Sequence, residues 1–159
     1  MIIGTLKEKK KFENRVAISP DEVKSYLKSG HQVLIEKGAG SLSGFTDKSY
    51  KEAGATITNS KEVLKTSEII IKINCPSPEE SKLINNKAMV VSQISTQNNQ
   101  ESIKILNSRK VSAFALELVP RITRAQDMDI LSSQANLAGY HAVIDAAQEF
   151  NRVLPLFMT

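Results

Sequence analysis

The sequence of 159 residues is poor in cysteine, histidine and aromatic side chains. Its single cysteine, Cys75, excludes an internal disulfide and a metal site built from several cysteines, and it is typical of a reducing, cytoplasmic setting. No apolar run approaches the roughly 20 residues that a membrane-spanning helix needs. The N-terminus also lacks the basic start and long apolar stretch of a signal peptide. We therefore expect no direct membrane insertion.

The charge balance is only mildly basic. Lys and Arg total 21 against 17 for Asp and Glu, which gives a net charge of +4. The one dense basic run consists of Lys7, Lys9, Lys10 and Lys11, and Phe12 is its only aromatic neighbour. Proteins that bind nucleic acids usually carry a larger basic stripe and stacking aromatics. We interpret the run as a solvated loop and expect no nucleic-acid partner.

Short apolar segments alternate with amphipathic ones along the chain. The predicted strands are 2–6, 32–36, 55–58, 68–73, 88–94 and 111–118, and the predicted helices are 20–30, 47–53, 60–66, 99–108 and 129–150. This alternation predicts βαβ units and a parallel sheet covered on both faces. We expect a three-layer α/β/α domain of flavodoxin-like or Rossmann-like type. Residues 154–159 are apolar where a new element should begin, which suggests a chain cut from a longer one.

The glycine-rich segment 38–44 stands after a predicted strand and before a predicted helix, as a dinucleotide phosphate loop does. Its spacing is GxGxxxG rather than GxGxxG, and Phe45 and Thr46 separate it from the helix. No acidic residue follows a strand about 20 residues later to bind a ribose. We therefore favour a structural loop whose glycines adopt positive φ.

Arg15 lies in an otherwise apolar segment, ENRVAISP, that runs from residue 13 to residue 20. A guanidinium in such a place could bind a carboxylate ligand with two hydrogen bonds. An ion pair with Glu13 or another acid explains it equally well. The sequence leaves these two interpretations open.

The segment 117–140 carries the densest group of polar side chains and begins where a predicted strand ends. Ligands of α/β sheets bind beyond the carboxyl ends of the strands. A helix turns by about 100° per residue. On the predicted helix this rotation places a group of polar side chains on one face, a stripe about 100° wide: Asp129, Ser132, Ser133, Asn136 and Tyr140. The rest of the helix is small and apolar, so we expect it to be buried and the stripe to pair with loops or to line a cleft.

Structural explanations exist for the same segment. Thr123 and Gln126 fit the pattern of a capping box, and Asp127 and Asp129 fit acids favoured at a helix start. We interpret the two histidines, His31 and His141, as structural. Cys75 has no nearby base candidate in the sequence, and no spacing typical of a metal site or of a Ser-His-Asp arrangement stands out.

Residues 121–140, RITRAQDMDILSSQANLAGY, resemble the signature of the α subunit of proton-translocating NAD(P) transhydrogenase. The segments 13–20, 30–40 (GHQVLIEKGAG) and 43–47 resemble both that family and the alanine dehydrogenases. The resemblance covers the whole chain. It implies that residues 1–159 are the N-terminal domain of a two-domain NAD(H)-binding subunit, whose Rossmann domain with GxGxxG lies beyond this chain.

The resemblance implies catalytic and cofactor-binding roles for Arg121, Gln126, Asp129 and Ser132, which match family positions around the nicotinamide of NAD(H). Arg121 and Asp129 would form a charge pair that orders the site. Asp129 and Ser132 would hydrogen-bond the carboxamide and ribose of the dihydronicotinamide. Gln126 would reach toward the nicotinamide ribose of NADP(H), which a partner subunit holds. No metal is implied.

Two positions separate the transhydrogenases from the alanine dehydrogenases. By the resemblance, the latter use a Lys where this chain has Asn74, and a His within the segment 92–96, which here holds none. Amino-acid oxidation needs that acid–base pair to move a proton. Direct hydride transfer between two nicotinamides needs only two rings held together in a site that excludes water. The resemblance is therefore closer to the transhydrogenases.

The implied activity is hydride transfer from NADH to NADP⁺, coupled to proton translocation, with this chain forming half of the cleft and inactive alone. The implied partners are a second copy in a homodimer, the second Rossmann domain, and the NADP(H)-binding and membrane components. The implied location is cytoplasmic, peripheral to the inner membrane through those partners. Two alternatives stay open: an alanine dehydrogenase-like amino-acid oxidoreductase, and a non-catalytic assembly module.

Overall fold

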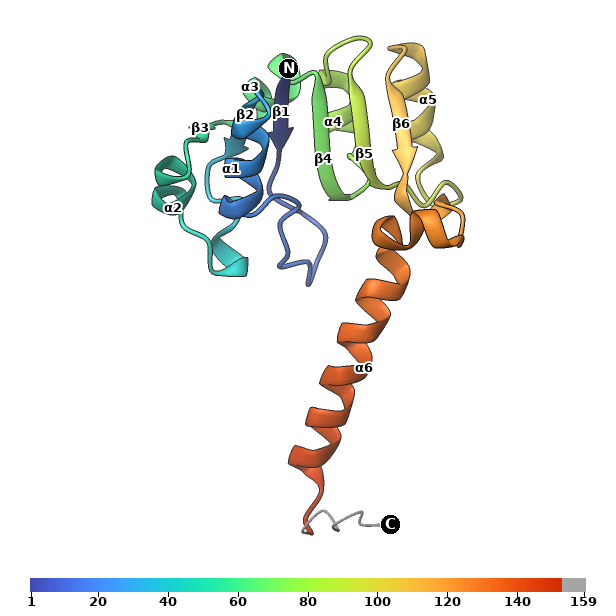
Figure 1. Cartoon of the computed structure of the whole chain (residues 1–159). Helices are drawn as coiled ribbons and strands as arrows, with labels where there is room; N and C mark the ends of the chain where they lie inside the picture. Colours follow the sequence, from blue (N-terminus) through green and yellow to red (C-terminus); the bar gives the residue numbers. More distant parts are fainter. Residues whose placement is uncertain (153–159) are drawn as a thin grey trace. The chain divides into compact units, whose positions relative to one another are not determined.

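Six strands form one parallel sheet in the computed structural model, which describes residues 1–152 (Figure 1). The strands are β1 (Ile2–Thr5), β2 (Gln32–Glu36), β3 (Thr56–Thr58), β4 (Ile69–Asn74), β5 (Met89–Gln93) and β6 (Ser112–Ala115). Their order is β3-β2-β1-β4-β5-β6, and every neighbouring pair is parallel. This order is that of a doubly wound sheet, and it confirms the predicted α/β class.

Helices lie on both faces of the sheet and complete three layers (Figure 1). Helices α1 (Pro20–Lys28) and α2 (Asp47–Glu52) cover one face, and α3 (Ser60–Thr66), α4 (Pro78–Leu83) and α5 (Gln100–Ser108) cover the other. The side chains of β2 alternate accordingly. Val33 and Ile35 join the core under α1 and α2, whereas Leu34 packs on the core of the opposite face.

Local capping explains where two of these helices begin. The hydroxyls of Ser19 and Ser77 accept hydrogen bonds from the N–H groups of Glu22 and Glu80, and each Glu carboxylate binds back to the cap N–H. A proline occupies the first turn of both helices. Helix α4 is an element that we did not predict, although the spacing of Ser77 and Glu80 is its signal in the sequence.

The predicted strand 111–118 is too long at its C-terminal end. Strand β6 stops at Ala115, and a short 3₁₀ turn, η2 (Leu116–Leu118), follows. The last residue of β6 pairs with Ser92 of β5, and the parallel ladder between the two strands ends there. Helices cover both faces as expected, but the cover does not reach the side chain of Phe114 on β6, which is 52% exposed. Helices α1 and α2 cover the β3-β2-β1 half of that face instead.

The chain divides into two units, Met1–Leu116 and Glu117–Thr159. In the second, a 3₁₀ segment, η3 (Thr123–Met128), precedes the long helix α6 (Ile130–Glu149), which lies within one residue of both predicted bounds. The expected burial of this helix is wrong, because none of its 20 residues is buried. None of the helices in residues 1–152 is long and apolar enough to cross a membrane. The predicted chain end at 154–159 lies outside the described residues.

Candidate functional site

A pocket of about 520 Å³ opens beyond the carboxyl ends of β1, β4 and β5. Strand order reverses between β1 and β4, which is where doubly wound sheets bind ligands. The lining is polar: Glu8, Lys9, Lys10, Lys72, Asn74, Cys75, Ser77, Pro78, Glu80, Gln93, Ser95, Asn98 and Asn99. All of these side chains belong to the unit Met1–Leu116.

Three charged side chains form a buried cluster on one wall of this pocket. The Nζ of Lys72 lies 3.7 Å from Oε2 of Glu8 and 3.6 Å from Oε2 of Glu80, and each side chain is at most 5% exposed. Lys9 adds a contact of 2.8 Å to Glu80 from the surface. Burial raises the pKa of Glu80, but the charge of Lys72 and the hydrogen bonds from Lys9 and Ser77 outweigh it, so the net pKa lies below its ordinary value.

Sequence reasoning missed this buried cluster. Its one visible signal is Lys72, a cation inside the otherwise apolar strand β4. Glu8 comes from the loop after β1, far away along the chain, whereas Glu80 lies in α4, the helix that follows β4. The carboxylate of Glu8 also accepts the backbone N–H of Ile73 at 2.8 Å, so the cluster joins the end of β4 to the loop after β1.

The position where the resemblance places a lysine in alanine dehydrogenases holds an amide with fixed partners. Nδ2 of Asn74 donates to Oε2 of Glu8 and to Oε2 of Glu13, both at 3.2 Å. The hydrogen bond from Arg15 is the largest cause that lowers the pKa of Glu13, to about 2, and Asn74 contributes. Asn74 is thus a hydrogen-bond donor to two carboxylates and not a proton carrier.

Arg15 forms the ion pair that was one of its two open interpretations. Its Nε and Nη2 donate to Oε1 and Oε2 of Glu13, each at 2.7 Å. This is the bidentate geometry in which a guanidinium binds a carboxylate most strongly. The carboxylate that Arg15 binds in this way belongs to its own loop.

The glycine-rich segment 38–44 is a structural loop, as we favoured. Gly38 and Gly44 have backbone φ angles of 73° and 82°, values that residues with a Cβ atom rarely adopt. The N–H of Gly38 donates to Oδ1 of Asp47 at 2.8 Å. A Cβ on Gly40 would come within 2.7 Å of the buried ring of Tyr50. These glycines close a turn and allow tight packing.

The structure brings two of the four predicted site residues into direct contact at the start of α6. Oδ2 of Asp129 accepts the hydroxyl of Ser132 at 2.6 Å, and Oδ1 accepts the N–H groups of Leu131 and Ser132 at 3.0 and 3.1 Å. Asp129 is therefore the N-cap of the helix. Its pKa lies below the ordinary value because of the Ser132 hydroxyl first, then the backbone N–H groups, and last the charge of Arg121.

The other two predicted residues lie nearby in sequence with exposed side chains. Arg121 acts on Asp129 through its charge, but within residues 1–152 the two form no ion pair shorter than 4 Å, so the expected charge pair is not a direct contact. Gln126 lies in η3, and its carbonyl accepts the N–H of Asp129 at 3.2 Å. The expected capping box at Thr123 is wrong, because no side chain caps η3.

The polar stripe of α6 continues from this start. The hydroxyl of Ser133 donates to the carbonyl of Asp129 at 2.9 Å, and Tyr140 is 71% exposed. On the same helix, His141 pairs with Asp145 at 2.9 Å, which agrees with its structural interpretation. Within the described part of the chain, no group of three or more His, Cys, Asp or Glu residues could hold a metal ion.

A comparison with known families covers both of these regions. The model of the family "Alanine dehydrogenase/PNT, N-terminal domain" matches residues 4–138. The chain belongs to this family. The match includes both the pocket at the sheet edge and the start of α6.

Relatives within the family agree with the predicted branch. An NAD(P) transhydrogenase subunit alpha of Rhodospirillum rubrum is 42% identical over 165 residues, covering 100% of this chain and 43% of that protein. The structure of transhydrogenase from Sinorhizobium meliloti has a TM-score of 0.91 at 43% identity, covering 100% of this chain and 48% of the other. An L-alanine dehydrogenase has a TM-score of 0.72 at 31% identity, covering 78% and 34%.

These comparisons confirm the predicted resemblance to the N-terminal domain of the transhydrogenase α subunit. The chain spans less than half the length of the relatives it matches. The family match runs without a break from the parallel sheet to the residues at the start of α6.

Proposed function

We propose that the chain supplies one wall of the NAD(H) site of a transhydrogenase, which passes hydride from NADH to NADP⁺ with coupled proton translocation. The observation that carries this proposal is the Asp129–Ser132 pair, exposed at the start of α6 and directly after the loop with Arg121 and Gln126. Relatives named NAD(P) transhydrogenase support it. In this proposal residues 1–159 form the N-terminal domain of a two-domain subunit.

The side chains at the start of α6 fit the polar part of a nicotinamide nucleotide. Ser132 offers a hydroxyl that is both donor and acceptor, Gln126 offers an amide, and Arg121 offers a guanidinium. Together they match a carboxamide and ribose hydroxyls, which also donate and accept. The bound dinucleotide would supply the hydride, as nicotinamide cofactors do.

The role of the protein residues is to hold and orient. Asp129 fixes the hydroxyl of Ser132 at 2.6 Å, so that this side chain is set before a ligand arrives. The lowered pKa of Asp129 keeps its carboxylate charged at neutral pH. Its charge interaction with Arg121 would help to order the loop before η3, and Gln126 within η3 would face the second nucleotide. No proton moves between these groups in this scheme, because hydride transfer needs none.

The proposal includes assembly. NAD(H) binds here, NADP(H) is held by a partner subunit, the chain acts as a homodimer, and it is cytoplasmic and peripheral to the inner membrane through the membrane component. The amino-acid oxidoreductase is the weaker candidate because Asn74 donates to two carboxylates where that chemistry requires a proton carrier.

The test uses a chimera in which residues 1–159 replace the matching segment of the Rhodospirillum rubrum α subunit, combined with that complex's other components. We expect Asp129→Asn and Gln126→Asn to lower the rate of hydride transfer by about 100-fold, the usual loss when one aligned polar group is removed. Asparagine is as good an N-cap as aspartate, so α6 should keep its start in Asp129→Asn.

Asp127→Asn is the matched control, because Asp127 is an exposed acid in the same loop. We expect its rate of hydride transfer to stay within twofold of that of the unmodified chimera. Circular dichroism melting would check that all variants fold alike. Equal rates for the control and for both site variants would contradict the proposal and favour a non-catalytic assembly module.

A further inference from the structure

We propose that residues 7–15, here called the basic loop, form a docking surface for an acidic protein surface on the partner that carries NADP(H). This inference rests on the proposed function, because only that function requires a second nucleotide-bearing protein. The loop contains the dense lysine run of the sequence, and it follows β1 at the carboxyl edge of the sheet.

Hydrogen bonds hold the basic loop at both ends. The N–H of Lys7 donates to Oε2 of Glu36 at 2.8 Å, and Glu8 accepts the N–H of Ile73 at 2.8 Å. Near the other end, the carbonyl of Asn14 accepts the hydroxyl of Ser43 at 2.6 Å. A loop that is already ordered loses less conformational entropy when a partner binds.

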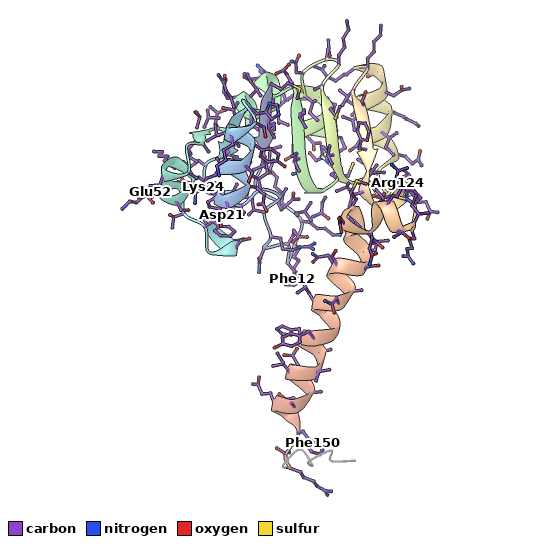
Figure 2. All side chains as sticks on the ribbon, viewed as in Figure 1. Phe12, Asp21, Lys24, Glu52, Arg124 and Phe150 are labelled. Carbon is purple, nitrogen blue, oxygen red and sulfur yellow. The ribbon has the colours of Figure 1, made fainter. Side chains whose placement is uncertain are left out.

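The tip of the basic loop presents an aromatic side chain. Phe12 is 87% exposed, and Figure 2 shows it at the end of the loop. The Nζ of Lys11 lies 4.8 Å from the centre of its ring, a cation–π distance. Aromatic side chains are enriched at protein interfaces and among the residues that contribute most to binding.

The charges of the basic loop are only partly neutralised. Lys9 pairs with Glu80, and Arg15 pairs with Glu13. Lys7, Lys10 and Lys11 are exposed, and among residues 1–152 none of them forms an ion pair with a carboxylate. The loop therefore projects uncompensated positive charge, which attracts and orients an acidic surface.

The place of the loop favours a protein partner over a membrane. Lys9 and Lys10 line the pocket at the carboxyl edge, so a partner that approaches the ligand-binding edge of the sheet meets the loop. Polybasic segments that bind anionic lipids carry about four to eight free cations, more than the three that remain here. The occupant of this surface is therefore an acidic patch of the NADP(H)-binding protein.

The test measures binding and turnover separately in the chimera described above. Isothermal titration with the NADP(H)-binding component of the Rhodospirillum rubrum complex gives the affinity. We expect the double variant Lys7→Glu/Lys11→Glu to weaken binding by about 10-fold or more, and Phe12→Ser by about fivefold. The rate at saturating partner should not change in either variant.

The matched control is Lys61→Glu/Lys65→Glu, which makes the same charge change at two exposed lysines of α3. We expect the affinity of this control for the partner to stay within twofold of that of the unmodified chimera. An affinity of the loop variants equal to that of the control would overturn the proposal. The proposal would also be overturned if the loop variants lost binding only to phosphatidylserine vesicles in a sedimentation assay. That result would make the loop a lipid contact.

The two proposals fail in different ways. If the chimera binds the partner through the loop but transfers no hydride, the proposed function fails and the docking surface stands. If turnover at saturating partner is normal but the affinity ignores the loop variants, the docking surface fails and the proposed function stands.

Discussion

The buried Lys72 cluster allows a sharp prediction about stability. Replacing Lys72 by methionine keeps the length of the side chain but leaves Glu8 and Glu80 without their shared cation, 3.7 and 3.6 Å away. Removing one partner of a buried ion pair costs about 3–5 kcal/mol. We expect the lower end, about 3 kcal/mol, because Lys9 still contacts Glu80 and backbone N–H groups still bind Glu8.

Urea unfolding followed by circular dichroism at 222 nm measures this loss, since the chain has no tryptophan. With a slope of about 2 kcal/mol per molar urea, a loss of about 3 kcal/mol lowers the midpoint by about 1.5 M. Lys82→Met is the matched control, because Lys82 is an exposed lysine on α4. It should change the free energy of unfolding by less than about 0.5 kcal/mol.

The loss should also depend on pH. The pKa of Glu80 is lowered in the folded protein, so its contribution is present above pH 4.5, its ordinary value, and is lost as the pH falls through the folded value. Without Lys72 the pKa of Glu80 rises, and protonation relieves the uncompensated charge at a higher pH. The difference between wild type and Lys72→Met should therefore be larger at pH 7 than at pH 4. A loss below about 1 kcal/mol, or one that is equal at both pH values, would refute this reasoning.

Three further changes test the packing and the loop charges. Gly40→Ala should lower the free energy of unfolding by about 2 kcal/mol, because its Cβ would meet the ring of Tyr50 at 2.7 Å; an unchanged melting curve would argue against that contact. Gly139→Ala should raise the stability of α6 by about 0.5–1 kcal/mol, since nothing lies within 4 Å of the new Cβ, and helicity by circular dichroism reports it. Arg15→Met should raise the pKa of Glu13 from about 2 toward 4.5, which carboxyl ¹³C chemical shifts follow; an unshifted titration would show that Asn74 and not Arg15 dominates.

Periodicity was enough to predict most of the sheet. The bounds of β2 and α3 match the prediction residue for residue, because apolar runs and capping residues mark them locally, and β3 starts one residue later than predicted. The end of β6 did not follow from the sequence, since it depends on where the ladder with its neighbour β5 ends. The exposure of α6 was also missed. A helix that is small and apolar on most sides looks buried, and its surroundings are set by whatever packs against it.

The candidate site was predicted in part for the same reason. Asp129 and Ser132 are three residues apart, so their contact is a local property of a helix start. Lys72 and Glu80 are close along the chain, but the contact of Lys72 with Glu8 spans more than 60 residues, which no local pattern encodes. Arg121, which was predicted to pair with Asp129, acts only through its charge, because the loop between them decides the distance.

The strand order has a consequence for the synthesis of the chain. Strand β1 is made first, yet it lies in the interior of the sheet and needs two neighbours. One of them, β2, is complete at residue 36, whereas β4 ends at residue 74. At roughly 5–20 residues per second, a ribosome leaves the second edge of β1 unpaired for roughly 2 to 8 seconds. During that interval the free N–H and C=O groups on that edge are open to pairing with any other strand nearby.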